Sequence, residues 1–329
     1  MLSQTASRHG PLIVTSLGHF TNDGTVFLIP IIIDLIATIY GTSALLITVS
    51  LTLFYFSTAV AANIAGPTID RHGAPAKGML IGIFVLSSGL LLFSVAFDNF
   101  MIPVVLIAAS VITGAGASFY HPAGSAILQS YYKGDRLGRY LGINGSFGSL
   151  GRALYPTLIV LVALAFSSHM ISVIFFGTVG IVFSLLIYQG IRDFGVGEVN
   201  RKAAGSPEKN DNPGNVESAG KSAMTGSILF LTVISLIRNL AFTGIMAWIP
   251  EFISFVRGVG SGPELETTMT IMFVGGIIGQ LVFGKLVETY DKRLILTVST
   301  ISSAILLFLY IDLSGILSLA SHPEKEFMV

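Results

Sequence analysis

Hydrophobic residues run through this chain in long blocks that shorter polar segments interrupt. A helix needs about 20 predominantly apolar residues to cross the hydrocarbon core of a bilayer. Nine blocks meet this requirement, and each predicts a membrane-spanning helix; their approximate ranges are 12–38, 43–66, 77–97, 102–130, 140–165, 169–190, 224–250, 266–287 and 293–313. The pattern therefore predicts an all-α polytopic membrane protein.

One polar segment is much longer than the others and divides the chain. It covers residues 192–223, is rich in Gly, Pro, Ser, Asn, Glu and Lys, and contains too few aliphatic residues to form a core. We interpret it as a flexible linker. The predicted organisation is a six-helix bundle over residues 1–191, the linker, and an incomplete bundle of three helices over residues 224–329.

Composition supports a membrane protein and excludes several other classes. The mean hydropathy is +0.79, and 11% of the residues are charged, against about 25% in soluble domains. The net charge is zero and no run of Lys or Arg occurs, so a nucleic-acid partner is not expected. Cysteine is absent, which excludes thiolate metal sites and cysteine nucleophiles.

Basic residues in the loops predict the orientation, because Lys and Arg concentrate on the cytoplasmic side of membrane proteins. Only Arg257 and Lys325 fall on the predicted outer side. All of the following fall on the other side: Arg8, Arg71, Lys77, Lys133, Arg136, Arg139, Arg192, Arg201, Lys202, Lys209, Lys221, Lys285, Lys292 and Arg293. The N-terminus and the linker are therefore expected in the cytoplasm, and the membrane is expected to be the plasma membrane.

Several predicted spans contain a charged or strongly polar residue near their middle. A charge at the bilayer centre costs roughly 2.5 to 3.5 kcal/mol, so such residues should face a polar cavity or one another. His19 and Asp23 are four residues apart and share one helix face. The expected substrate and proton pathway comprises His19, Asn22, Asp23, His121, Asn144, Arg152, Arg238 and Asn239.

Within this set, Asp23, Arg152 and Arg238 have similar depth and are expected to share a midplane cavity, with the two histidines at its cytoplasmic end. Arg152 and Arg238 suit the binding of a phosphonate, phosphate or carboxylate. Two alternatives stay open. Asp23 either takes up a proton or forms a permanent ion pair with one of these arginines, and the histidines either belong to the pathway or bind carbonyls freed near helix ends.

A short motif closes the second predicted span: Gly66, Asp70, Arg71 and Gly73 in the arrangement Gly-x-x-x-Asp-Arg-x-Gly. Gly284 and Glu288 repeat part of it at the end of the eighth span. The motif resembles the loop between the second and third helices of major facilitator superfamily transporters. That resemblance implies a glycine that allows close helix approach, and an acid and an arginine that hold two halves together. The basic pair expected after the second glycine is replaced by Ala74 and Pro75.

Further segments are similar to the fosmidomycin-resistance type of major facilitator efflux proteins. They are Gly18-His-Phe-Thr-Asn-Asp23, Phe119-Tyr-His-Pro-Ala123, the glycine-rich run from Gly142 to Gly151, and Arg238-Asn239 with Trp248-Ile-Pro250. This resemblance implies an antiporter that exports a small amphipathic or anionic compound in exchange for protons by alternating access. We expect no enzyme activity, no cofactor and no bound metal. Arg152 departs from the pattern, which has small residues there.

Two other functions remain as alternatives. One is an intramembrane hydrolase that uses His19, Asp23 and His121 around a metal. The other is a membrane remnant or binding subunit that does not transport, because the second bundle lacks the counterpart of the fourth span. We expect the chain to be a C-terminally truncated transporter that transports little or nothing by itself, unless a second chain supplies the missing helices.

Overall fold

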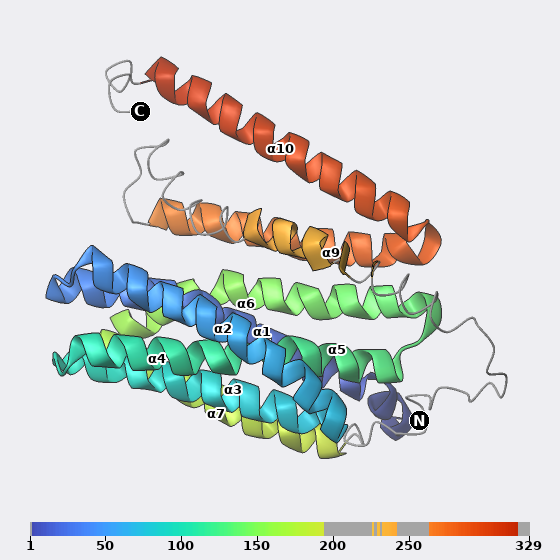
Figure 1. Ribbon diagram of the computed structural model, residues 1–329, viewed down its shortest axis with the longest axis horizontal. Coiled ribbons are helices and arrows are strands. Elements are labelled where there is room, and N and C mark those ends of the chain that lie inside the picture. Colours follow the sequence, from blue (N-terminus) through green and yellow to red (C-terminus); the bar gives the residue numbers. More distant parts are fainter. Residues whose placement is uncertain (1, 194–225, 227–228, 231, 242–262, 322–329) are drawn as a thin grey trace. The chain divides into compact units, whose positions relative to one another are not determined.

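The computed structural model describes residues 2–193, 226, 229–230, 232–241 and 263–321, and this part of the chain is nearly all helical, with no strand (Figure 1). The helices are α1 (Leu2–Tyr40), α2 (Ala44–His72), α3 (Pro75–Phe93), α4 (Ile102–Ala117), α5 (Tyr120–Tyr131), α6 (Leu137–Phe166), α7 (His169–Asp193), α9 (Pro263–Thr289) and α10 (Lys292–Ser321). Two short 3-10 helices, η1 (Ser94–Asp98) and η2 (Gly134–Arg136), precede α4 and α6. The all-α fold class is therefore confirmed.

Eight helical segments of the described chain are long and apolar enough to cross a membrane. They are His9–Tyr40, Ala44–His72, Pro75–Asp98, Ile102–Tyr131, Leu137–Phe166, His169–Ile191, Thr270–Thr289 and Lys292–Leu309. These correspond to the first six and the last two of the nine predicted spans. The seventh contains the helix Thr232–Ala241, and its remainder lies outside the described residues, as does nearly all of the predicted linker.

The first six spans pack into one bundle (Figure 1). They belong to a compact unit that also includes Thr270–Thr297, whereas Gly205–Met269 and Val298–Val329 form a second unit. The most extensive contacts join α1 to α6, α3 to α4 and α7, and α2 to α4. One apolar cluster gathers Leu28, Ile29, Ile32, Ile33, Ile36 and Phe93 among others, and a second gathers Met79, Ile83, Ala123 and Ile127. These clusters give α1 and α5 a fixed packing environment.

The ends of α2 and the beginning of α10 follow from local sequence chemistry. Ser43 caps α2, because its side chain accepts a hydrogen bond from the Leu46 amide at 3.3 Å. Gly73 ends α2 in the left-handed conformation with φ of 57°, which glycine adopts without steric cost. The Asp291 carboxylate accepts bonds from the Arg293 and Leu294 amides at 2.8 and 3.1 Å at the start of α10.

The sequence pattern predicted one continuous helix over residues 102–130, but the structure shows that the fourth span is interrupted. It consists of α4 and α5, which Ser118 and Phe119 separate. Pro122 is the third residue of α5. In a continuous helix Pro122 would clash with the carbonyl four residues earlier and donate no hydrogen bond, whereas in the first turn of a new helix its missing N–H costs nothing. The break places Tyr120 and His121 in the first turn of α5.

Glycines allow α1 and α6 to approach closely along the face that bears the polar residues. A Cβ atom on Gly151 would lie 2.3 Å from the Phe20 carbonyl oxygen, and one on Gly24 would lie 2.6 Å from the Tyr155 ring. Such distances are shorter than real Cβ contacts, so any larger residue would push the two helices apart. The glycine-rich run is therefore a packing surface, and it brings side chains from α1 and α6 within hydrogen-bonding distance.

Candidate functional site

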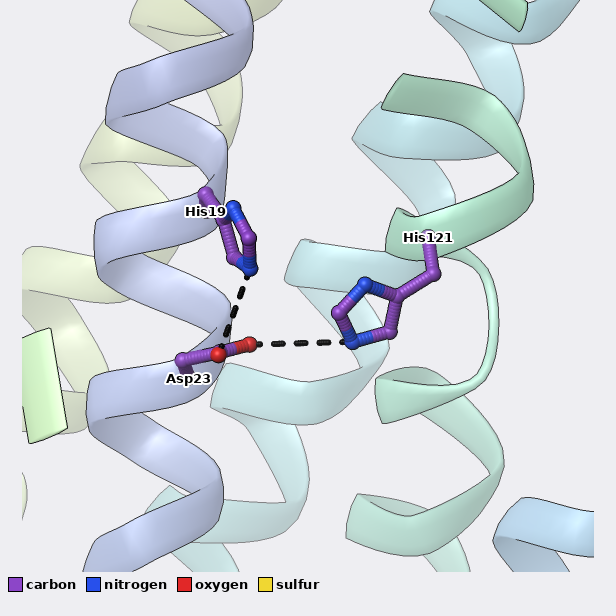
Figure 2. A group of neighbouring side chains, drawn as sticks. All are labelled: His19, Asp23 and His121. Atoms are coloured by element: carbon purple, nitrogen blue, oxygen red, sulfur yellow. Dashed lines mark ion pairs between the residues drawn. The ribbon is translucent and has the colours of Figure 1, made fainter. Parts of the chain in front are cut away.

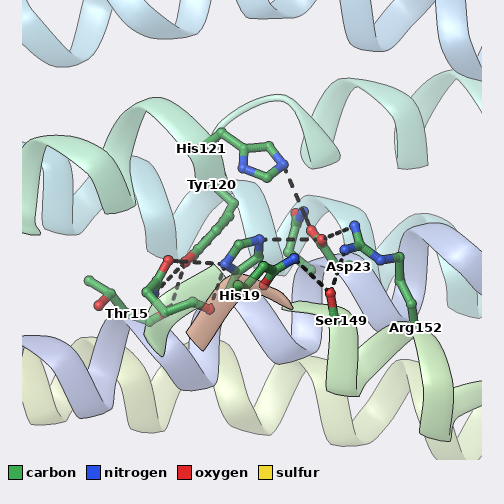
Figure 3. Close-up of polar contacts among 10 residues, drawn as sticks. Thr15, His19, Asp23, Tyr120, His121, Ser149 and Arg152 are labelled. Carbon is green, nitrogen blue, oxygen red and sulfur yellow. Dashed lines mark hydrogen bonds and ion pairs between the residues drawn. The ribbon is translucent and has the colours of Figure 1, made fainter. Parts of the chain in front are cut away.

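The side chain of Asp23 lies at the centre of a polar cluster (Figure 3). The cluster lies in the compact unit that contains the first six spans, which we call the first-unit bundle. The Asp23 side chain is 7% exposed and comes from α1. Its Oδ2 atom accepts a hydrogen bond from Arg152 Nη1 at 2.8 Å, and its Oδ1 atom accepts one from Asn22 Nδ2 at 3.1 Å. The short distance to Arg152 makes this contact an ion pair between α1 and α6.

Two histidines complete the surroundings of the Asp23 carboxylate (Figure 2). His19 Nε2 lies 3.3 Å from Oδ2, and His121 Nε2 lies 3.7 Å from Oδ1. His19 is one helical turn before Asp23 on α1, and its side chain is 13% exposed. His121 comes from the first turn of α5, and its side chain is 63% exposed. Three helices thus direct cationic or polar groups to one carboxylate.

A hydrogen-bond network behind His19 fixes the orientation of its ring. Nδ1 lies 2.9 Å from the Asn144 backbone oxygen and 3.0 Å from Asn144 Oδ1. Asn144 Nδ2 donates to the Tyr120 hydroxyl at 3.1 Å, and this hydroxyl donates to the Thr15 backbone oxygen at 2.8 Å. Because backbone oxygens only accept, Nδ1 of His19 must carry a hydrogen. The neutral ring therefore presents the lone pair of Nε2 toward Asp23.

Arg152 has contacts besides Asp23. Its Nη2 atom donates to Ser149 Oγ at 2.9 Å, and Gln280 Nε2 donates to the same hydroxyl oxygen at 2.8 Å. The guanidinium carbon lies 5.8 Å from the ring centre of Phe273, within the range of a cation–π interaction. Its Nε atom is buried and has no hydrogen-bond partner among the described residues. The guanidinium thus has an unused donor for a further acceptor.

The absence of a side chain at Gly148 makes room for the cluster. A Cβ atom there would lie 2.5 Å from His19 Nε2 and 2.9 Å from Asp23 Oδ2. The carboxylate and the imidazole therefore lie directly against the backbone of α6. A glycine is needed at this point for Arg152, one turn further along α6, to reach Asp23.

The structure brings together six of the eight residues expected in the pathway: His19, Asn22, Asp23, His121, Asn144 and Arg152. The two histidines lie directly beside the carboxylate, and their expected place at the cytoplasmic end of a cavity stays a prediction. Arg238 and Asn239 lie on the helix Thr232–Ala241, which belongs to the second compact unit. Their participation stays a prediction.

Sequence reasoning did not assign roles to Thr15, Tyr120, Ser149 and Gln280. Tyr120 stands next to His121 in the segment that carried the family resemblance, and Ser149 precedes Arg152 by three residues. The three-residue spacing, which places two side chains on one helix face, was the available signal for Ser149. Thr15 contributes only a backbone oxygen, and no side-chain pattern indicates such a role.

The residues of the loop motif have different surroundings from one another. Asp70 and Arg71 are exposed at the end of α2, and neither forms a salt bridge among the described residues. A Cβ atom on Gly66 would meet no atom within 4 Å in the part of the chain that the structure describes. One on Gly284 would lie 2.9 Å from the Cα of Gly142. Glu288 follows on the same helix, and its Oε1 atom is buried with no hydrogen-bond partner among the described residues.

The fold and the site together define a class of protein before any comparison. Helices that can cross a bilayer surround a buried ion pair, two imidazoles and a free arginine donor. Charged groups inside membrane helices mark the pathways of ions and substrates. The arrangement is that of a multi-pass membrane protein with a polar site between its helices.

Comparison with known families agrees with this class. The family model of the Major Facilitator Superfamily matches residues 15–322, so the chain belongs to this superfamily of membrane transporters. The match includes α1 from Thr15 onward and therefore the whole polar cluster. A search of curated proteins gave no match. The family supports a role in moving small-molecule solutes across a membrane rather than in catalysis.

Proposed function

We propose that this protein is a secondary active transporter that exports a small amphipathic or anionic compound in exchange for protons. The observation that carries the proposal is the buried Asp23 carboxylate between Arg152 and two histidines, in a chain of the Major Facilitator Superfamily. A carboxylate exchanges a proton, and an arginine binds an anion. Coupling follows if protonation of Asp23 weakens its ion pair and leaves the Arg152 guanidinium available to the solute.

The segments that resemble the fosmidomycin-resistance type of efflux proteins support this direction of transport. They contain His19, Asp23 and His121, which lie together in the polar cluster. The unused Nε donor of Arg152 supports a solute with a phosphonate, phosphate or carboxylate group. An intramembrane hydrolase would need a general base besides its metal ligands, and no further His, Asp or Glu joins the cluster among the described residues.

A flux assay tests the proposed function, and it also tests the contrary expectation from the sequence that the chain alone transports little. The purified chain, reconstituted in proteoliposomes, should move a radiolabelled organic phosphonate or carboxylate when a pH gradient is imposed. Transport should saturate with solute concentration and should disappear when a protonophore collapses the gradient. A neutral amide analogue of the same solute is the control and should move at least about tenfold more slowly, because it lacks the charge that Arg152 binds. Flux that ignores the gradient would contradict proton coupling.

We also propose that the N-terminus is cytoplasmic, as the distribution of loop Lys and Arg indicates, and that the membrane is the plasma membrane. The chain has no cysteine, so single-cysteine variants report topology directly. Asp98 in η1 and Lys133 just before η2 are both exposed. An impermeant thiol reagent added outside intact cells should label Asp98→Cys and not Lys133→Cys. Labelling of position 133 alone would reverse the orientation.

A further inference from the structure

The Asp23 cluster has the composition of a transition-metal site. It offers two imidazole nitrogens and one carboxylate oxygen, and one ligand atom from each residue lies within 4.8 Å of the others. The two nitrogen-to-oxygen distances are 3.3 and 3.7 Å. Ligands of a tetrahedral zinc ion, with bonds of about 2.1 Å, lie about 3.4 Å apart. Both nitrogen-to-oxygen distances are close to this spacing, and the two imidazoles face different oxygens of the carboxylate, His19 facing Oδ2 and His121 facing Oδ1.

The hydrogen bonds of His19 prepare its Nε2 atom for a cation. Both partners of Nδ1 on Asn144 are oxygens at 2.9 and 3.0 Å, which fixes the hydrogen on Nδ1. Metal-binding histidines commonly donate their other ring N–H to a carbonyl in this way. The Nε2 lone pair then lies 3.3 Å from an oxygen of Asp23. Two electron-rich atoms at this distance attract a positive charge between them, either a proton on Nε2 or a metal ion.

His121 can complete the ligand set with a small movement. Its ring stands edge-on to that of His19, with centres 5.4 Å apart, and Figure 2 shows its nitrogen directed at Asp23. Its side chain is largely exposed, so it is free to rotate, whereas His19 and Asp23 are held inside the bundle. A bound ion would have two fixed ligands, one mobile ligand and an open position for water or a solute atom.

Arg152 shares the carboxylate with this site. It donates to Oδ2 of Asp23, the oxygen nearest His19, while Oδ1 faces His121 and accepts a hydrogen bond from Asn22. If an ion draws the carboxylate away, the guanidinium keeps its hydrogen bond to Ser149 and its contact with the Phe273 ring. Its positive charge would weaken the affinity for a divalent ion without removing any ligand.

We propose that His19, Asp23 and His121 form a binding site for one divalent transition-metal ion of the zinc type. Two imidazoles and one carboxylate suit Zn²⁺, Co²⁺ or Ni²⁺, whereas Mg²⁺ and Ca²⁺ prefer sets made only of oxygen. All three ligands belong to α1 and α5 of the first-unit bundle, so the site does not require the alternating movement of a transporter. The inference goes beyond the proposed transport function and does not depend on it.

Direct metal binding to the full chain tests this proposal. The protein is purified in detergent, any polyhistidine tag is cleaved, and bound metal is removed with a chelator. Calorimetric titration with Zn²⁺ should give one ion per chain, and Co²⁺ should give visible absorption that Zn²⁺ abolishes by displacement. Mg²⁺ should not compete. The absence of stoichiometric Zn²⁺ binding would overturn the proposal, whatever the flux assay shows.

Three variants locate the ion. His19→Gln, Asp23→Asn and His121→Gln each remove one ligand and should weaken Zn²⁺ binding at least about tenfold, since even residues that only orient a ligand contribute this much. His121 is exposed, so its substitution should leave the fold intact. His72→Gln is the matched control, because His72 is an exposed histidine at the end of α2 whose Nδ1 contacts the Thr68 carbonyl. Unchanged binding in His121→Gln, or equal loss in His72→Gln, would place the metal elsewhere.

Discussion

Replacing Asp23 with asparagine is expected to abolish solute flux driven by a pH gradient while solute binding and solute exchange persist. Asparagine has nearly the same shape but cannot take up a proton, and its oxygen can still accept a hydrogen bond from Arg152 at the position of Oδ2. The measurement compares gradient-driven uptake with counterflow exchange in the same proteoliposomes. Uptake should fall to the level of protein-free vesicles.

Asp70→Asn is the control for this experiment. Asp70 is an exposed carboxylate at the end of α2, and it forms no salt bridge in the described part of the chain. It should leave both activities unchanged. If Asp23→Asn kept its full gradient-driven uptake, the carboxylate would be a permanent structural partner of Arg152, the second of the two roles that the sequence left open.

Replacing Arg152 with glutamine is expected to destabilise the protein by about 3 kcal/mol. The loss of one partner from a buried ion pair leaves the other charge uncompensated, which costs about 3 to 5 kcal/mol. The lower figure applies because the Arg152 side chain is 26% exposed and His19 remains near the carboxylate. The free energy of unfolding, measured in mixed detergent micelles, checks this value.

The double variant Asp23→Asn, Arg152→Gln separates the ion pair from other effects of the substitution. It removes both charges, so its loss of stability should be at least about 1 kcal/mol smaller than the sum of the two single losses. Arg71→Gln is the control, because Arg71 is exposed and should change stability by less than about 0.5 kcal/mol. Additive losses would mean that Asp23 and Arg152 do not stabilise one another.

The fold class and the centre of the site were predictable because the bilayer imposes strict conditions on a sequence. Long apolar blocks give the helices, and a charge within one block needs a partner at similar depth in another. Asp23 and Arg152 satisfy this condition, because Nη1 of Arg152 lies 2.8 Å from Oδ2 of Asp23. The same condition applies to Arg238, but its helix lies in the second compact unit, so its partner stays a prediction.

The position of His121 was harder to predict, because it depends on where the backbone of the fourth span breaks. The apolar character of the chain continues through Ala117, Ser118 and Phe119, so hydropathy shows no end to the helix there. Pro122 was visible in the sequence, but proline also occurs within long helices of this chain, such as at Pro30 and Pro156. Only the packed structure shows which proline coincides with a break.

The hydrogen bonds that orient the His19 ring could not be predicted for a related reason. The Tyr120 hydroxyl binds a backbone oxygen of Thr15, which is 105 residues away in the chain. A backbone acceptor has no residue type that a pattern could reveal. The same applies to the contact of His19 with the Asn144 carbonyl.

That carbonyl contact bears on how the site tolerates mutation. Every amino acid carries the same main-chain oxygen, so substitutions at position 144 that preserve the helix would remove the amide oxygen but leave the nearer acceptor of His19 in place. The orientation of the His19 ring should therefore tolerate substitution of Asn144. A library that randomises position 144 should therefore leave the imidazole tautomer unchanged, so any change in transport that it produces would come from the side chain at this position and not from a reoriented His19.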